Sequence, residues 1–257
     1  MNERLLFDTH AHYDDAAFDA DREELLARLP SDGVRYVVNV GCDLESSRRA
    51  VALAQRYDYL YAGVGIHPGN AEACTPEALS ELRRLAAQPK VVAIGEIGLD
   101  YHYDTPPRDI QRDAFCAQMH LAQALGLPVS IHDRDAHGES LAIVREFPDV
   151  RGVFHCFSGS VETARELVAL GWYLGFTGVV TFQNAKKTAA VAADAPEDRI
   201  LIETDCPYLS PEPYRGRRCD SSRLLYTGAK IAALRGKTPE EIYRLTCENA
   251  RRFYRIS

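Results

Sequence analysis

The chain has 257 residues, of which 46% are hydrophobic, 26% charged and 9% aromatic, and this composition excludes a disordered or fibrous protein. Its formal net charge of −7 excludes a protein that coats nucleic acid through a basic surface, so a polyanionic substrate would have to be held locally. The chain has no apolar run near the roughly 18 residues of a membrane-spanning helix and no signal-peptide pattern after Met1, so we expect one cytoplasmic, monomeric domain over residues 1–257.

Short apolar runs alternate with longer segments of helical pattern along the whole chain. Thr75 followed by Pro76 marks the start of a helix. Gly126 and Pro128 mark the end of another helix, whose apolar residues recur at spacings of three or four. The run Thr-Pro-Glu-Glu at 238–241 predicts a capping box at the start of the final helix. The expected strands cover residues 5–9, 36–40, 59–66, 91–97, 129–131, 152–154, 173–177 and 200–203.

This alternation predicts the fold class. The strands are almost continuously apolar, as expected for a parallel sheet with both faces buried, and the strand and helix pattern repeats eight times. An α/β protein built as a (β/α)8 TIM barrel fits this order. A doubly wound open sheet is the alternative, but it would carry a Gly-rich phosphate turn after the first strand. The sequence there is Asp-Thr-His-Ala-His, which favours the closed barrel.

Histidines and carboxylates recur where the predicted strands end, and in a parallel barrel these ends meet at one mouth. His10 and His12 lie two residues apart, about 6.6 Å along one face of a strand, so both imidazoles could reach one cation. Taken singly, each residue is more often structural, but convergence at one end favours a shared site. The set is His10, His12, His67, Glu96, His132, His155, Glu203 and Asp205, whereas His102, His120 and His137 are interpreted as structural.

The mixture of imidazoles and carboxylates suits divalent cations such as Mg, Mn or Zn. The seven cysteines are scattered and include no Cys-x-x-Cys pair, which argues against a structural zinc site. Four of these histidines together with two of the carboxylates already exceed the number of ligands that one tetrahedral ion needs. The sequence therefore predicts a dinuclear metal site at the C-terminal mouth of the barrel, with one carboxylate bridging the two ions.

Six short motifs follow one another along the chain. They read DTHAH at 8–12, GIHP at 65–68, GEIGLDY at 95–101, HCFSG at 155–159, TF at 181–182 and ETDCPYL at 203–209. In this combination the sequence resembles the TatD family of metal-dependent deoxyribonucleases, from Asp8 to the C-terminus. One segment departs from the family pattern: residues 217–222 read Arg-Arg-Cys-Asp-Ser-Ser where the family usually has Asn and Pro, and this puts the substrate rim in doubt.

The resemblance implies a 3′–5′ exonuclease that acts on DNA, with single strands favoured and Mg as the usual activating ion. It also implies that Glu96 bridges two divalent cations. One cation would be held by His10, His12, Glu96 and Asp205, and the other by Glu96, His132 and His155.

A mechanism is predicted for this site. A metal-activated water would attack a phosphodiester, with Asp205 as the proton acceptor. Glu203 would orient the water or a metal ligand, and a structural role for Glu203 is equally compatible with the sequence. His67, Arg134 and Arg215 are candidates for contact with phosphate, because cations and imidazole donors form charge-assisted hydrogen bonds with it.

Two other functions stay open from the sequence alone. The same site could hydrolyse a small carbonyl substrate such as a lactone, an amide or an aminoacyl ester, because fold and metals do not select the bond. A metal-containing adaptor that binds nucleic acid or protein without turnover is the third possibility. The bridging carboxylate and the adjacent base argue against the adaptor, since binding alone needs neither.

Overall fold

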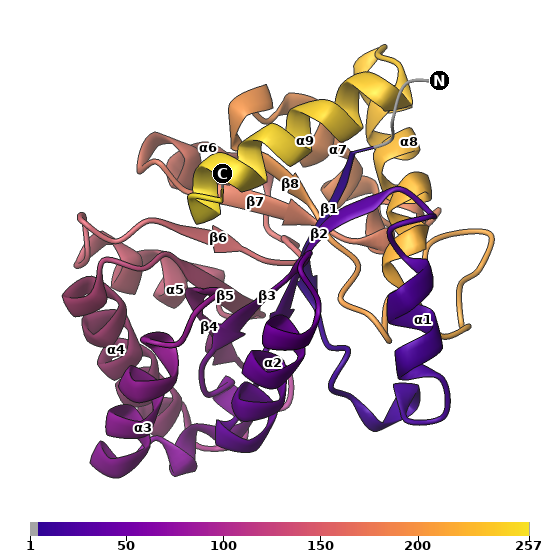
Figure 1. Cartoon of the computed structure of the whole chain (residues 1–257). Coiled ribbons are helices and arrows are strands. Elements are labelled where there is room, and N and C mark those ends of the chain that lie inside the picture. Colours follow the sequence, from indigo (N-terminus) through magenta and orange to yellow (C-terminus); the bar gives the residue numbers. More distant parts are fainter. Residues whose placement is uncertain (1–4, 257) are drawn as a thin grey trace.

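The computed structural model describes residues 5–256 and shows eight parallel strands in one sheet, in the order β1 to β8 (Figure 1). Each strand pairs with the next one along the chain, and helices occupy the connections. The strands are β1 (Leu6–Ala11), β2 (Val34–Val40), β3 (Leu60–Val64), β4 (Val91–Asp100), β5 (Val129–Arg134), β6 (Gly152–Phe154), β7 (Tyr173–Phe176) and β8 (Ile200–Ile202).

Hydrogen bonds between the end of β1 and the segment that follows β8 close the sheet into a barrel. The Asp205 backbone N–H donates to the carbonyl of His10 over 2.9 Å, and the N–H of His12 donates to the carbonyl of Cys206 over 2.8 Å. Both bonds lie just beyond β8, on the side where the strands end. The predicted (β/α)8 TIM barrel is confirmed, and the doubly wound open sheet is excluded.

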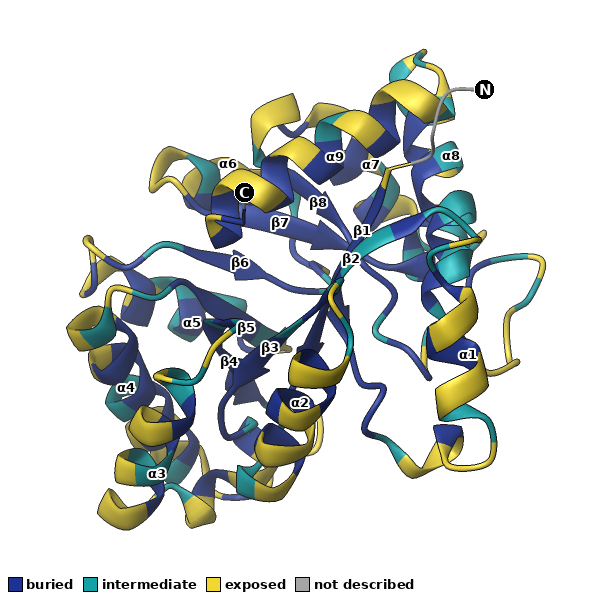
Figure 2. Ribbon diagram, in the orientation of Figure 1, coloured by how far each residue is buried: buried dark blue, intermediate teal, exposed yellow. Residues whose placement is uncertain are grey.

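Helices surround the barrel with their polar faces outward, and the strands between them are buried (Figure 2). None of the helices within residues 5–256 is long and apolar enough to cross a membrane. The α-helices are α1 (Arg22–Arg28), α2 (Leu44–Arg56), α3 (Pro76–Ala86), α4 (Arg108–Leu125), α5 (His137–Arg145), α6 (Val161–Ala169), α7 (Lys186–Asp194), α8 (Leu224–Arg235) and α9 (Pro239–Tyr254). Short 3-10 helices are η1 (Ala16–Phe18), η2 (Pro68–Ala73), η3 (Gly178–Thr181), η4 (Glu197–Arg199) and η5 (Ser221–Arg223).

The predicted helix boundaries are confirmed. The Thr75 side chain accepts a hydrogen bond from the backbone N–H of Ala78 at the start of α3. Helix α4 ends at Gly126, whose φ of 64° is a left-handed conformation that favours glycine. Thr238 and Glu241 form both bonds of the capping box at the start of α9.

Several strand boundaries differ from the prediction. Strands β1, β4 and β5 extend to Ala11, Asp100 and Arg134, so His10 and His132 lie inside strands and not after them. The β4–β5 ladder continues through the pair Gly98 and His132, because polar residues at the mouth can keep their backbone bonds while their side chains leave the core. Strand β3 instead ends at Val64, two residues before the predicted end at 66.

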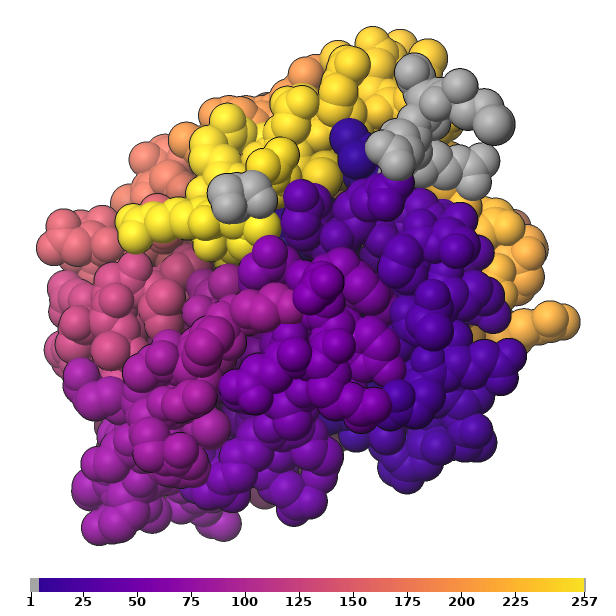
Figure 3. Space-filling model, viewed as in Figure 1, coloured from indigo at the N-terminus to yellow at the C-terminus, as the bar shows by residue number. Residues whose placement is uncertain are grey.

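The last helix, α9, and the divergent segment at 217–222 both form hydrogen bonds with the first strand, β1. Helix α9 lies against the start of the chain (yellow beside indigo, Figure 3), and the Tyr254 hydroxyl donates to the carbonyl of Thr9 over 3.1 Å. The Ser221 hydroxyl donates to a carboxylate oxygen of buried Asp8 over 2.6 Å. The divergent segment therefore supports the strand that carries His10.

Candidate metal centre

Six side chains from the ends of five strands meet at the mouth of the barrel, with Glu96 at their centre. β1 carries His10, and His12 follows it directly; β4 carries Glu96 and β5 carries His132. His155 follows β6, and Asp205 follows β8. The structure thus brings together all six residues that the sequence predicts as metal ligands: His10, His12, Glu96, His132, His155 and Asp205.

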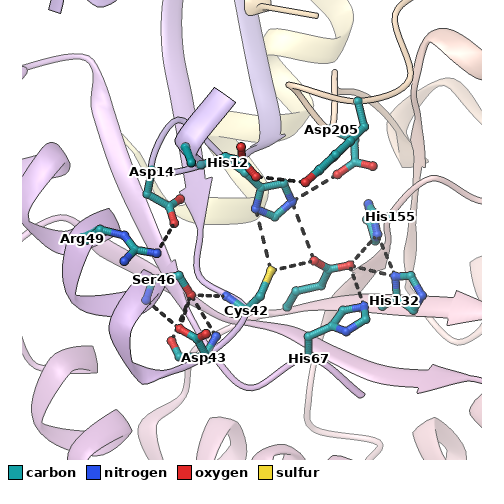
Figure 4. A pocket seen from close by; sticks show the side chains of 14 residues that line it. His12, Asp14, Cys42, Asp43, Ser46, Arg49, His67, His132, His155 and Asp205 are labelled. Atoms are coloured by element: carbon teal, nitrogen blue, oxygen red, sulfur yellow. Dashed lines mark hydrogen bonds and ion pairs between the residues drawn. The ribbon is translucent and has the colours of Figure 1, made fainter. Parts of the chain in front are cut away.

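One oxygen of Glu96 faces the second group of predicted ligands. His132 Nδ1 lies 2.8 Å from Glu96 Oε1, and His155 Nε2 lies 2.9 Å from the same oxygen. The sequence-predicted phosphate contact His67 approaches it too, with its Nε2 atom at 3.8 Å. In Figure 4 the rings of these three histidines converge on this carboxylate.

The other oxygen of Glu96 faces the first group. His10 Nε2 lies 3.5 Å and His12 Nε2 3.8 Å from Glu96 Oε2. Asp205 Oδ1 is 3.1 Å from His12 Nε2. Asp205 also has a φ of 58°, a left-handed conformation that is uncommon without glycine and that often marks functional positions. The carboxylate of Glu96 therefore lies between two groups of nitrogen and oxygen atoms.

Each candidate ligand imidazole has a polar group next to its second ring nitrogen, and this group orients the ring. His12 Nδ1 donates to the carbonyl of Val40 over 2.8 Å, and His10 Nδ1 lies 3.1 Å from the Ser130 hydroxyl. On the other side of Glu96, His132 Nε2 lies 3.1 Å from Asp100 Oδ2. The fourth ring, His155, turns its Nδ1 atom toward buried Glu203, at 3.6 Å from Oε1. Such partners fix which ring nitrogen is left with a lone pair for a metal.

When the imidazoles are neutral, as in a metal-bound state, these contacts place electron pairs against electron pairs. Because the Nδ1–H of His12 donates to a carbonyl, its Nε2 lone pair faces the Asp205 carboxylate. The same holds for His132, whose Nε2–H donates to Asp100 while Nδ1 faces Glu96. A cation between the facing atoms relieves this repulsion, and the donor types are those of divalent metals. The residues therefore fit the predicted cofactor.

The site's electrostatics also favour bound positive charge. Burial raises the pKa of Glu96, but the imidazoles of His155 and His67 outweigh it and hold that pKa well below the ordinary value. Burial and the proximity of His155 lower the pKa of His10, whereas neighbouring acidic groups outweigh burial and raise the pKa of His12, His132 and His155, so these three rings attract positive charge as protons or as metal. Four sets of residues within 5–256 have ligand atoms within 4.8 Å of one another. Two of them match the predicted division, namely His10, His12 and Glu96, and Glu96, His132 and His155; the other two are His10, His155 and Glu203, and His67, Asp100 and His132.

Two cavities adjoin this cluster and share part of its residues. The larger cavity, of about 690 Å³, includes the predicted phosphate contact Arg134 in its lining, and the smaller has a volume of about 410 Å³. His67 lines both. Arg215, predicted as a third phosphate contact, stacks on the Phe182 ring at 4.2 Å and lines neither cavity.

Glu203, predicted to act in catalysis or to position a ligand, lies behind His155. It is fully buried and accepts hydrogen bonds from the Cys156 backbone N–H at 2.5 Å and from the Thr9 hydroxyl at 3.1 Å. It lines neither cavity. His102, His120 and His137, interpreted as structural, pair with Asp135, Phe147 and Asp133 outside the cluster.

The sequence did not identify three residues that lie next to the candidate ligands. Asp100 and Ser130 orient imidazoles, and the Cys42 thiol lies 3.5 Å from Glu96 Oε2. Asp100 could have been found, because it is an acidic residue within the motif at 95–101. Ser130 and Cys42 carry no signal of their own, because their roles depend on which strand lies next to which.

Together, the barrel and its histidine and carboxylate cluster define a hydrolase of metal-dependent type. The chain belongs to the TatD related DNase family, whose model matches residues 7–255. This confirms the resemblance and the interpretation as a TatD-type metal-dependent hydrolase.

Individual relatives agree over the full length. "Uncharacterized metal-dependent hydrolase YabD" of Bacillus subtilis is 46% identical over 255 residues, covering 98% of this chain and 100% of that protein. "3'-5' ssDNA/RNA exonuclease TatD" of Cronobacter sakazakii is 38% identical, with 97% of each chain covered. The crystal structure of YJJV, a TatD homologue from Escherichia coli K12, matches with a TM-score of 0.93, 32% identity and complete coverage of both chains.

Proposed function

We propose that this protein is a metal-dependent 3′–5′ exonuclease that cleaves single-stranded DNA or RNA. The observation that carries the proposal is the convergence of four imidazoles and Asp205 on Glu96 at the mouth of the barrel. The relative named as an exonuclease for single strands supports the choice of substrate. The predicted monomeric state and cytoplasmic location belong to the same proposal.

The predicted ligands divide into two groups that share Glu96. In this proposal His10, His12, Glu96 and Asp205 hold one cation, and Glu96, His132 and His155 hold the other. The identity of the cations is left among Mg, Mn and Zn. Bound there, such ions supply charge that stabilises a phosphoryl group under attack and lower the pKa of water.

The chain's own groups supply the remaining steps. Asp205 accepts the proton of the attacking water, because its carboxylate lines both cavities where a substrate would lie. Glu203 serves as a positioning residue, since it touches His155 from behind and is shielded from both cavities. His67 and Arg134 are the phosphate contacts that the cavity linings support.

The test uses metal-depleted protein to which Mg, Mn or Zn is added separately. Single-stranded DNA, RNA and duplex DNA, labelled at the 5′ end, are digested by the wild type, Asp205→Asn and a surface control, Asp194→Asn. Asp194 pairs with Arg165 on the surface at 3.0 Å, so its loss should leave activity unchanged. We expect stepwise shortening from the 3′ end that requires both metal and Asp205.

Two outcomes would overturn the proposal. Hydrolysis of lactones or aminoacyl esters without any cleavage of nucleic acid would favour the carbonyl substrate. Tight binding of DNA with no product under any of the metals would favour the adaptor.

A further inference from the structure

The two cavities beside the metal centre differ in chemistry, although they share His67, His132, His155, Asp205 and Tyr208. A substrate bound at the cluster therefore has access to both cavities. Their linings decide which side can hold a polyanionic strand.

The smaller cavity is acidic. Its lining beyond the shared residues includes the carboxylates of Asp15 and Asp43, together with Asp14, whose side chain is only 6% exposed and is paired with Arg49 and Asn39. The one basic side chain in that lining, Arg49, is already engaged, with Nη2 at 3.6 Å from Asp14 and Nη1 at 2.5 Å from Glu45. A phosphate placed in this cavity would meet like charges at close range, which is unfavourable.

The larger cavity is aromatic and apolar. Within residues 5–256 four large apolar side chains are exposed, and two of them line this cavity: Tyr103 at 68%, and Tyr208 at 54%, which the smaller cavity shares. Phe157, Val179 and Leu209 line it as well. Exposed aromatic rings beside a catalytic centre are the stacking surfaces that proteins use for unpaired bases.

This cavity also offers a cation. The guanidinium carbon of Arg134 lies 5.1 Å from the centre of the Tyr103 ring, and Arg134 is exposed. Apart from Asp205, which both cavities share, the other charged residues in the lining are Asp100 and Asp133, whose side chains are only 4% exposed and are paired with His132 and His137. The accessible charge of this cavity is therefore positive.

We propose that the substrate strand binds on the side of the larger cavity, with bases stacked on Tyr103 and Tyr208 and a backbone phosphate held by Arg134. This inference rests on the proposed exonuclease function and adds the direction in which the strand crosses the site. The acidic cavity then accommodates only the terminal nucleoside, because a chain that continued through it would bring in another phosphate. Cleavage is restricted to the chain end for this reason.

The first experiment measures binding without turnover. Fluorescence anisotropy of labelled single-stranded oligonucleotides is followed with Asp205→Asn protein, alone and combined with Tyr103→Ala, Tyr103→Phe or Leu170→Ala. Leu170 is the matched control, since it is 45% exposed and lies at the end of α6, outside both cavities. The comparison is between a dinucleotide and a longer strand.

We expect Tyr103→Ala to raise the Kd for the longer strand roughly tenfold, as loss of one stacked base does, and to reduce the gain in affinity with length. Tyr103→Phe keeps the ring and should bind like the control. Equal Kd values for Tyr103→Ala and Leu170→Ala would overturn the inference. Because binding is measured without cleavage, a failure of this inference can be told from a failure of the proposed function. If Tyr103→Ala weakened binding of the strand but the wild-type protein cut no nucleic acid, only the proposed function would be overturned.

The second experiment tests the acidic side through the end group of the substrate. Wild-type protein should degrade a strand ending in a 3′-phosphate more slowly than one ending in a 3′-hydroxyl. The variant Asp43→Asn removes one charge of the acidic cavity, and asparagine still caps helix α2, which begins after this residue. We expect the discrimination to fall by about threefold or more. Equal discrimination in the variant and the wild type would contradict the proposed orientation.

Discussion

The two halves of the candidate metal centre share Glu96 but are supported in different ways. In the half with His10 and His12, the outer ring nitrogens meet uncharged groups, the Ser130 hydroxyl and a backbone carbonyl. In the half with His132 and His155, the outer nitrogens face carboxylates, those of Asp100 and Glu203. The first half instead has its own carboxylate, Asp205, beside the ligand nitrogens.

This difference concerns how each half attracts a cation. A carboxylate behind an imidazole makes the ring a more basic ligand and fixes its orientation. In the proposed dinuclear site, the half with His132 would draw part of its affinity for a cation from carboxylates that do not touch the ion, whereas the half with His10 would draw it from Asp205 directly. Substitution of the residues next to the outer ring nitrogens should therefore lower the metal affinity of the two halves by unequal amounts.

The largest effect is expected at the carboxylate that both halves share. Glu96→Gln keeps the shape of the side chain but removes its charge, so both ions should be lost. Turnover should fall by more than about 100-fold, which exceeds the roughly 10–100-fold effect of losing an outer partner. Metal content, measured by mass spectrometry after dialysis, should fall in parallel, with circular dichroism unchanged.

The matched control for this variant is Glu166→Gln. Glu166 pairs with Arg145 on the surface, where such a pair contributes at most about 1 kcal/mol to stability. Its activity and metal content should equal those of the wild type. If Glu96→Gln behaved like this control, Glu96 would not be a bridging ligand and the comparison of two halves would lose its basis.

A smaller and one-sided effect is expected from Asp100→Asn. The asparagine oxygen can still accept the backbone hydrogen bonds of His102 and Tyr103, so the loop keeps its shape. The carboxylate behind His132 is lost, and affinity for one of the two ions should drop by roughly 10–100-fold. Isothermal titration with Mn or Zn should show one weakened and one unchanged site. Two sites weakened equally would contradict the division into halves.

The sequence placed the candidate ligands in one cluster but did not identify the residues that orient them. Apolar runs identify buried strands, and the topology of a parallel barrel brings their C-terminal ends together, so His10, Glu96 and His132 could be assigned to one mouth. Asp100 reaches His132 only because Gly98 of β4 pairs with His132 of β5, and local patterns do not encode that register. Arg215 lies in the long connection after β8, where side-chain direction depends on tertiary contacts such as the Phe182 ring.

The smallest effect is expected behind the other half, at Ser130. Ser130→Ala removes the hydroxyl next to His10 Nδ1 and leaves every carboxylate of the cluster in place. A neutral hydrogen bond contributes about 0.5–1.5 kcal/mol, so affinity for one ion should fall by less than about tenfold. The same titration measures this loss directly against that of Asp100→Asn. A loss at Ser130 as large as that at Asp100 would mean that ring orientation, and not the charge behind the imidazole, sets the affinity of both halves.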